Sequence, residues 1–215
     1  MTHHVFIDNS NIFGGAQSMS ARVERHVPWP ALRVHFRNLA LLVEGSQQVG
    51  SRVLAGSVPP GNDDLWSYAR DMKYETNLLR KIEKGDGRLG EQGVDELLHL
   101  KVANLLLDSA EAQALVLVTG DGRVSQFGTG FALQAERALK RGWQVEIWSW
   151  KSALSPAFGK LSTAYGAKIR IHDFDKFFKS VTFVKGGYYG PPAVAKIVNL
   201  AGRIVAQLPS PLKVY

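Results

Sequence analysis

Short apolar runs alternate with segments of helical periodicity along most of the chain. Near-continuous apolar runs are typical of strands that are buried on both faces of a sheet. Apolar residues that recur every three or four positions are typical of amphipathic helices. Buried strands are predicted over residues 4–7, 51–58, 76–82, 114–119, 143–150 and 168–172. Helices are predicted over residues 32–42, 63–72, 94–107, 128–141 and 157–165.

This alternation predicts an α/β domain with an open, mainly parallel sheet and helices on both faces. The pattern ends near residue 183, just before a glycine- and proline-rich stretch. We therefore expect a domain over residues 1–183 and a C-terminal appendage over 184–215. Part of the appendage, residues 193–207, is predicted to be helical. Two glycine-containing polar segments, 9–15 and 83–93, are predicted as loops, with irregular structure continuing from 16 to 30.

Composition narrows the classes of partner and compartment. Hydrophobic residues make up 45% of the 215 residues and charged residues 21%, which is an ordinary globular balance. The formal net charge of +7 favours an anionic partner, and nucleic acid is the commonest one for a compact basic domain. The absence of cysteine excludes disulfides, zinc–cysteine sites and thiol catalysis. With no signal-peptide core and no bilayer-length apolar run, we expect an intracellular protein, cytoplasmic or nuclear, without a membrane partner.

Three aspartates lie where the predicted elements would bring chemistry together. Asp8 ends the first strand, and Asp121 follows the strand 114–119 through Gly120. Open parallel sheets bind ligands outside the carboxyl ends of their strands, so both carboxylates are expected at the same edge. If the two strands are neighbours, these groups lie close together. Asp95 opens the helix 94–107 and can reach the same edge.

Clustered carboxylates repel each other unless a cation neutralises them, and Mg²⁺ or Mn²⁺ suits oxygen ligands. Such a metal can activate water and clamp a scissile phosphate. Taken singly, Asp8 can cap the following turn, Asp95 can occupy a helix N-terminus, and Asp121 can be a turn residue. Gly120 and Gly122 favour a ligand site, because glycine lets a ligand approach the backbone closely.

Three segments together resemble a known family. Residues 5–12, Val-Phe-Ile-Asp-Asn-Ser-Asn-Ile, resemble the opening motif of NYN domains, a branch of the PIN-like metal-dependent ribonucleases. Residues 93–95, Gly-Val-Asp, resemble the second acidic motif of that family. Residues 117–121, Leu-Val-Thr-Gly-Asp, resemble the third. The resemblance covers residues 4–175, and the order of the motifs agrees with the family.

The resemblance implies a PIN-like sheet and an endoribonuclease that cleaves RNA with a metal-activated water. It implies that Asp8, Asp95 and Asp121 are catalytic residues that hold Mg²⁺ or Mn²⁺. Asn11 matches an amide position of the first motif and would orient water or phosphate. Thr119 matches the hydroxyl position of the third motif; ending its strand is the structural alternative.

The chain also departs from the family pattern. Many members carry a second acid two residues after the third-motif aspartate, where this chain has Arg123, and many carry a late aspartate that is missing from 157–165. Arg123 either binds a substrate phosphate through a bidentate contact or is a solvated loop residue. Lys151 is a candidate for a basic substrate-binding surface, and Asp173 is expected to end the last strand.

Two other classes of function stay open. An RNA-binding module with a degenerate, weakly active or inactive nuclease site would explain the missing acids. A haloacid-dehalogenase type of phosphatase would need an acid two residues after Asp8, where this chain has Ser10. His99 shares the helix face of Asp95 and is expected to serve packing or the surface. RNA is the expected partner, and a homodimer is left open.

Overall fold

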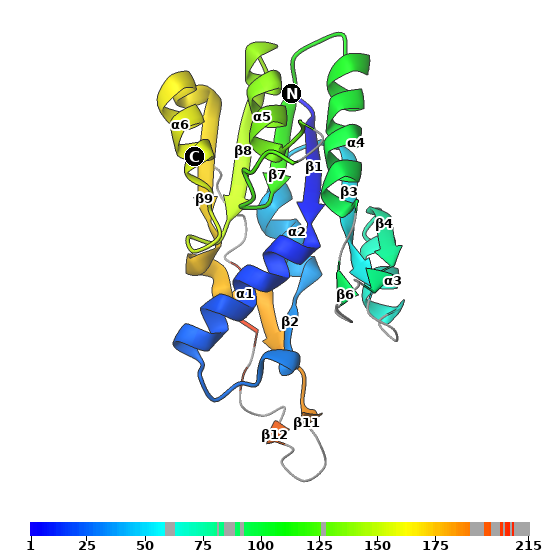
Figure 1. The fold of residues 1–215 in the computed structure, drawn as a ribbon, viewed down its shortest axis with the longest axis vertical. Coiled ribbons are helices and arrows are strands. Elements are labelled where there is room, and N and C mark those ends of the chain that lie inside the picture. Colours follow the sequence, from blue (N-terminus) through cyan, green and yellow to red (C-terminus); the bar gives the residue numbers. More distant parts are fainter. Residues whose placement is uncertain are drawn as a thin grey trace.

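Six strands form one parallel sheet in a computed structural model of the chain (Figure 1). The structure describes residues 1–58, 63–80, 82–83, 89–90, 93–125, 128–189, 196–198, 203, 205–206 and 208. The order of the strands is β4-β3-β1-β7-β8-β9. Their bounds are β1 (His3–Asp8), β3 (Val49–Val58), β4 (Glu75–Arg80), β7 (Ala114–Val118), β8 (Gln144–Ser149) and β9 (Ile169–Asp173). The predicted open parallel α/β architecture is confirmed.

The strand order places a topological switch point between β1 and β7. From β1 the chain builds the sheet in one direction through β3 and β4, and it then returns to build β7, β8 and β9 on the other side. Ile7 of β1 lies opposite Val118 of β7, so the two strands end at the same level. Parallel sheets bind ligands at such a point, because the connections diverge there.

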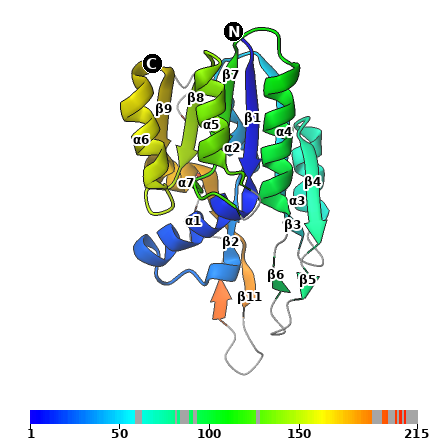
Figure 2. The same cartoon turned by 45° about the horizontal axis from the view of Figure 1, so that its top comes forward.

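Helices cover both faces of the sheet (Figure 2). On one face, the core contains residues of α1 (Asn9–Val23), α2 (Phe36–Glu44), α3 (Asp63–Asp71) and α7 (Phe178–Val181). On the other face, the core contains residues of α4 (Val94–Asp108), α5 (Phe131–Lys140) and α6 (Pro156–Tyr165). The strands between them are buried on both sides, which is why they read as continuous apolar runs.

Short antiparallel ladders extend the fold near the carboxyl ends of the central strands (Figure 1). They pair β2 (Leu32–Val34) with β10 (Thr182–Val184), β11 (Gly187–Tyr189) with β12 (Lys196–Val198), and β5 (Ile82–Glu83) with β6 (Leu89–Gly90). Three 3-10 turns complete the described elements: η1 (Trp29–Ala31), η2 (Gly166–Lys168) and η3 (Phe174–Phe177).

The structure corrects several predicted elements. The predicted helix 32–42 begins as strand β2, and its helix, α2, starts only at Phe36. The helix predicted over 193–207 is wrong for its described residues, because 196–198 form β12 and 203, 205 and 206 are not helical. The remaining positions of that prediction lie outside the described residues. The predicted loop 83–93 is wrong at Glu83, Leu89 and Gly90, which lie in strands β5 and β6, and its residues 84–88 and 91–92 are not described.

The described part of the appendage contacts the domain that precedes it. Arg203 forms an ion pair with Glu24 at 2.8 Å, and Leu208 packs against the core on the α1 face. None of the described helices is long and apolar enough to cross a membrane.

Helix α1 is the largest correction, since its first half was predicted as a loop. Asp8 caps the helix, and its Oδ1 accepts a hydrogen bond from the Asn11 N–H at 3.0 Å. Gly14 and Gly15 suggested a turn, but Gly15 instead allows α1 to pack closely against the Trp150 side chain. A Cβ at Gly15 would lie 2.2 Å from Cδ1 of Trp150. The helix therefore passes the indole at a distance that only glycine allows.

Alanine substitutions at these adjacent glycines are expected to have opposite effects. Gly14→Ala should raise the free energy of unfolding by about 0.5–1 kcal/mol, because a Cβ there has no heavy atom within 4 Å. Gly15→Ala should lower it by about 1–3 kcal/mol, because the methyl group overpacks against Trp150. Urea denaturation of both variants measures the two changes, and changes of the same sign would contradict the packing described for α1.

Candidate functional site

A buried hydrogen bond joins the carboxyl ends of β1 and β7. The Thr119 hydroxyl donates to Oδ2 of Asp8 at 3.0 Å. Asp8 is 2% exposed and Thr119 is also buried. Because water is excluded, this contact and the helix-capping bond to Oδ1 fix the orientation of the Asp8 carboxylate. The strand-end and capping role is therefore real for Asp8, and it places a carboxylate at the switch point.

Asn11 forms a second link across the same edge. Its Oδ1 accepts a hydrogen bond from the Gly120 N–H at 2.8 Å. The Asp121 N–H in turn donates to the Thr119 hydroxyl at 3.2 Å. The first turn of α1 and the loop after β7 are thus held together by side chains of the two motifs. The amide oxygen of Asn11 acts on the protein backbone here, and its contact with water or phosphate stays a prediction.

Asp121 is engaged by Arg123. The Arg123 N–H donates to Oδ1 at 2.8 Å, and its guanidinium donates to both carboxylate oxygens, with Nη2 2.9 Å from Oδ2. Burial by itself raises the pKa of Asp121, but the hydrogen bonds and charge of Arg123 outweigh it and hold that pKa below its usual value. Asp121 is therefore ionised at neutral pH. The Arg123 side chain is 87% exposed, so this ion pair can open at little cost.

Asp95 lies in the first turn of α4, two residues after the N-cap Gly93, whose φ of +83° lies in the left-handed region. The hydrogen bond and charge of Asp121 raise the pKa of Arg123, and the charge of Asp95 adds to that effect. Asp95 therefore acts on the same loop as Asp121. Within the part of the chain that the structure describes, however, no three His, Cys, Asp or Glu side chains lie close enough together to hold a metal. Asp8 and Asp121 thus follow the ends of neighbouring strands, but with Asp95 they do not form a three-acid group that could hold a metal.

The donor set nevertheless suits one kind of metal site. Asp8 and Asp121 offer carboxylate oxygens, the ligand type that Mg²⁺ and Mn²⁺ prefer. Mg²⁺ is usually held by one or two carboxylates together with waters and substrate phosphates, and not by a full cage of protein ligands. Asp8 and Asp121 would suit such an open site, provided that Asp121 exchanges Arg123 for the metal.

The glycines around Asp121 have a packing role. A Cβ at Gly120 would lie 2.3 Å from the carbonyl oxygen of Ala153, and one at Gly122 would lie 2.6 Å from Oγ of Ser155. The Ser155 N–H also donates to the Gly120 carbonyl at 2.9 Å. These contacts account for glycine at both positions, and the approach of a ligand to this backbone stays a prediction. The two glycines let the loop after β7 pack against residues 153–155.

Lys151 follows β8 at the same end of the sheet but faces acidic neighbours. Its Nζ lies 3.3 Å from Oδ2 of Asp173, and its N–H donates to Oδ1 of Asp175. Asp173 ends β9 and accepts a hydrogen bond from the Asp175 N–H, so its predicted strand-end role is confirmed. A contact between Lys151 and substrate stays a prediction.

His99 is a residue whose relation to the site was missed. Of the two roles expected for it, packing is the one observed: His99 is buried and packs edge-on against Phe131 with ring centroids 4.3 Å apart. Neither ring nitrogen has a hydrogen-bond partner among the described residues. Burial lowers the pKa of His99, and the charges of Glu96 and Asp121 partly oppose this effect. The i+4 spacing relates His99 to Asp95 in the sequence. Only the fold brings the charge of Asp121 close enough to affect the pKa of His99.

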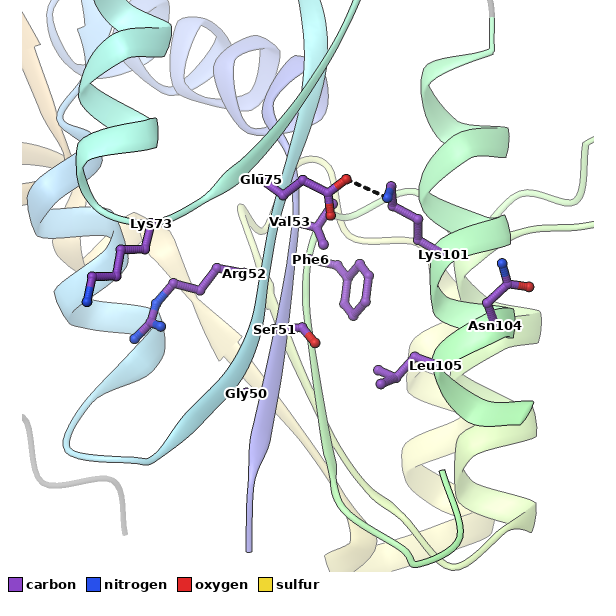
Figure 3. Close-up of a pocket in the computed structure, with 10 residues that line it drawn as sticks. All are labelled: Phe6, Gly50, Ser51, Arg52, Val53, Lys73, Glu75, Lys101, Asn104 and Leu105. Atoms are coloured by element: carbon purple, nitrogen blue, oxygen red, sulfur yellow. Dashed lines mark hydrogen bonds and ion pairs between the residues drawn. The ribbon is translucent and has the colours of Figure 1, made fainter. Parts of the chain in front are cut away.

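A cavity of about 470 Å³ lies away from this edge, between β3, the start of β4 and α4 (Figure 3). Figure 3 shows the Lys101–Glu75 ion pair, at 2.6 Å, between α4 and β4. Gly50 and Ser51, in the first half of β3, contribute to its lining. None of the predicted site residues lines this cavity.

No protein-family model matches the chain, and no curated protein matches its sequence. Among solved structures, the chain resembles a protein of unknown function, VPA0982, from Vibrio parahaemolyticus RIMD 2210633. That match has a TM-score of 0.55 and 16% identity, and it covers 81% of this chain and 94% of the other. A PLP-bound putative aminotransferase from Clostridium difficile 630 gives a TM-score of only 0.30 with 9% identity, over 80% of this chain and 46% of the other. The first match supports the fold alone, and the second is too distant to support an argument.

Proposed function

We propose that this protein is a metal-dependent endoribonuclease of the NYN type that cleaves RNA at the carboxyl edge of β1 and β7. The observation that carries the proposal is the buried Asp8 carboxylate, fixed by Thr119 at the switch point of the sheet. Burying a charged carboxylate costs free energy. A site that uses the negative charge of Asp8 would explain why this carboxylate is buried. The net charge of +7 supports a polyanionic substrate.

Each residue of the edge has a role in this proposal. Asp8 and Asp121 hold Mg²⁺ or Mn²⁺, with Asp95 as the third acid. The metal, when bound, supplies an activated water and neutralises charge on the scissile phosphate. Thr119 positions Asp8 through its hydroxyl, and Asn11 positions the loop that carries Asp121.

Arg123 is the proposed phosphate contact. Its guanidinium now donates to both oxygens of Asp121, and a phosphate presents the same bidentate acceptor geometry. Substrate binding would therefore exchange a carboxylate for a phosphate on Arg123. This exchange frees Asp121 for the metal at the moment when the substrate arrives.

The proposal is tested by cleavage of a labelled single-stranded RNA with Mn²⁺, with Mg²⁺ and with a chelator. Products that form only with metal support the nuclease. RNA binding without metal-dependent products would exclude it in favour of the binding module below. If the protein neither binds nor cleaves RNA, that result contradicts both proposals.

A specific observation favours a second candidate, an RNA-binding module with a degenerate nuclease site. Arg123 occupies a position where related motifs carry an acid, and it neutralises Asp121. Together with the lack of a three-acid group among the described residues, this arrangement favours anion binding over metal binding. The binding module predicts salt-dependent affinity for RNA and no effect of chelator.

Arg123→Ala separates the two roles of the arginine. Because Arg123 holds the pKa of Asp121 low, the substitution should raise that pKa toward its usual value. Affinity for RNA should fall, with the slope of log K against log salt reduced by about one, if the guanidinium contacts a phosphate. Affinity for Mn²⁺ should rise, since Asp121 loses its competing cation.

Arg70→Ala, at the exposed end of α3, is the matched control and should change neither affinity. Filter binding over a salt series and a Mn²⁺ titration measure the two affinities. An unchanged salt slope in Arg123→Ala would remove Arg123 from the substrate site.

A further inference from the structure

Helix α4 is apolar on its outer side as well as on its buried side. Its inner side packs on the sheet through Val94, Leu98, Val102 and Leu106. On the outer side, Leu100 is 57% exposed and Leu107 is 73% exposed. A helix that is apolar all round is normally covered on every side.

The exposed leucines form a short stripe centred on Asn104. Leu100 precedes the exposed Asn104 by one helical turn, and Leu107 follows it by about one turn. Leu97 extends the stripe toward the N-terminus of α4 and is half-buried. Figure 2 shows α4 beside α5 over one face of the sheet, and no described element lies over the outer side of α4. The described residues therefore leave the stripe uncovered.

We infer that this outer stripe of α4 binds the same stripe of a second copy of the chain, antiparallel and about a two-fold axis at Asn104. The leucines are placed almost symmetrically about that residue, so Leu100 of one copy meets Leu107 of the other, and the reverse contact follows from symmetry. The two Asn104 amides lie at the centre, where a polar pair fixes the register of two packed helices.

Charge complementarity supports this occupant. Lys101 and Asp108 flank the stripe on the same side, because they are seven residues apart on α4. In the antiparallel arrangement, Lys101 of each copy faces Asp108 of the other. Lys101 already contacts Glu75 at 2.6 Å, and its ammonium has three N–H donors, so it can contact a second carboxylate as well. In a parallel arrangement each Lys101 would face the Glu96 side instead, so exchanging the charges of Lys101 and Asp108 distinguishes the two orientations.

The stripe is short, so the association is expected to be of micromolar strength, roughly, and not that of an obligate dimer. Sedimentation equilibrium over a concentration series should show a monomer–dimer equilibrium for the full chain. The paired substitution Leu100→Glu with Leu107→Glu should weaken it by about tenfold or more, because it places four like charges in one interface. Both residues are exposed, so the variant should fold, and its thermal melt checks this.

Leu41→Glu is the matched control, since Leu41 is 53% exposed on α2, on the other face of the sheet. It should leave the equilibrium unchanged. Asp108→Lys should weaken association, and Lys101→Asp added to it should restore association if the helices are antiparallel.

Three outcomes would overturn the inference or part of it. A wild-type chain that stays monomeric at all concentrations excludes a second copy as the occupant. A dimer that survives Leu100→Glu with Leu107→Glu places the interface elsewhere. A dimer that Asp108→Lys weakens and Lys101→Asp does not restore excludes the antiparallel arrangement.

Discussion

Asp8→Asn is expected to abolish metal-dependent cleavage of RNA while the protein stays folded. The loss should be at least about a hundredfold, because the substitution removes a charged ligand from the proposed metal. The fold should survive, since asparagine caps a helix as well as aspartate does and its amide oxygen can still accept the Asn11 N–H. Its amide group can also donate to the Thr119 hydroxyl, which keeps the edge connected.

Asp121→Asn should lose cleavage to a similar extent. Its affinity for RNA should stay equal or rise, because one carboxylate that repels phosphate is gone. Asp71→Asn, on the exposed end of α3, is the control and should cleave as the wild type does. Initial rates on a labelled RNA with saturating Mn²⁺ measure all three variants. If Asp8→Asn cleaves at the wild-type rate, the site proposed here is not where the reaction takes place.

Arg203→Met is expected to destabilise the fold by about 3 kcal/mol, because it leaves a buried carboxylate without its cation. Nε of Arg203 lies 2.8 Å from Oε1 of Glu24, and the Arg203 side chain is only 8% exposed. The same guanidinium donates to the Thr182 hydroxyl at 2.7 Å and lies 4.7 Å from the centre of the Phe178 ring. The appendage is thus joined to α1, α7 and β10 through one side chain.

The control is Arg22→Met, which removes an exposed ion pair with Asp175 and should cost less than about 1 kcal/mol. Adding Glu24→Gln to Arg203→Met should recover part of the lost stability, since no unpaired charge is then buried. Urea denaturation at neutral pH gives the three free energies. Equal costs for Arg203→Met and Arg22→Met would show that the appendage does not dock through Arg203.

The strands and most helices could be predicted because their signals are local. The apolar run at 114–119 predicts a strand buried on both faces, and β7 forms at 114–118. The periodicity at 94–107 predicts α4. Helix α1 was missed because a glycine such as Gly15 can indicate either a turn or a close contact within a helix. Only the position of Trp150, 135 residues later in the chain, shows that Gly15 allows a close contact. The exposed side of α4 was missed because leucine spacing alone does not say which side meets the sheet.

The sequence indicates which residues are candidates for the site, but it does not indicate the contacts that these residues make. The positions of Asp8 and Asp121 after two apolar runs placed both carboxylates at one edge, and β1 and β7 are indeed neighbours. The Thr119 hydrogen bond to Asp8 joins residues 111 positions apart, so no local pattern could show it. The same holds for Asn11 and Gly120, which are 109 positions apart.

The sequence by itself determined the open parallel α/β class, the strand-end positions of Asp8 and Asp121, and the helix that carries Asp95. Periods of apolar residues arise from the geometry of a single strand or helix, so a single sequence records them. Only the tertiary structure decided that β1 and β7 are neighbours, that Arg123 engages Asp121, and that Leu100 and Leu107 face outward. Strand order and side-chain partners depend on segments far apart in the chain, and their energies belong to pairs of residues that no single segment contains.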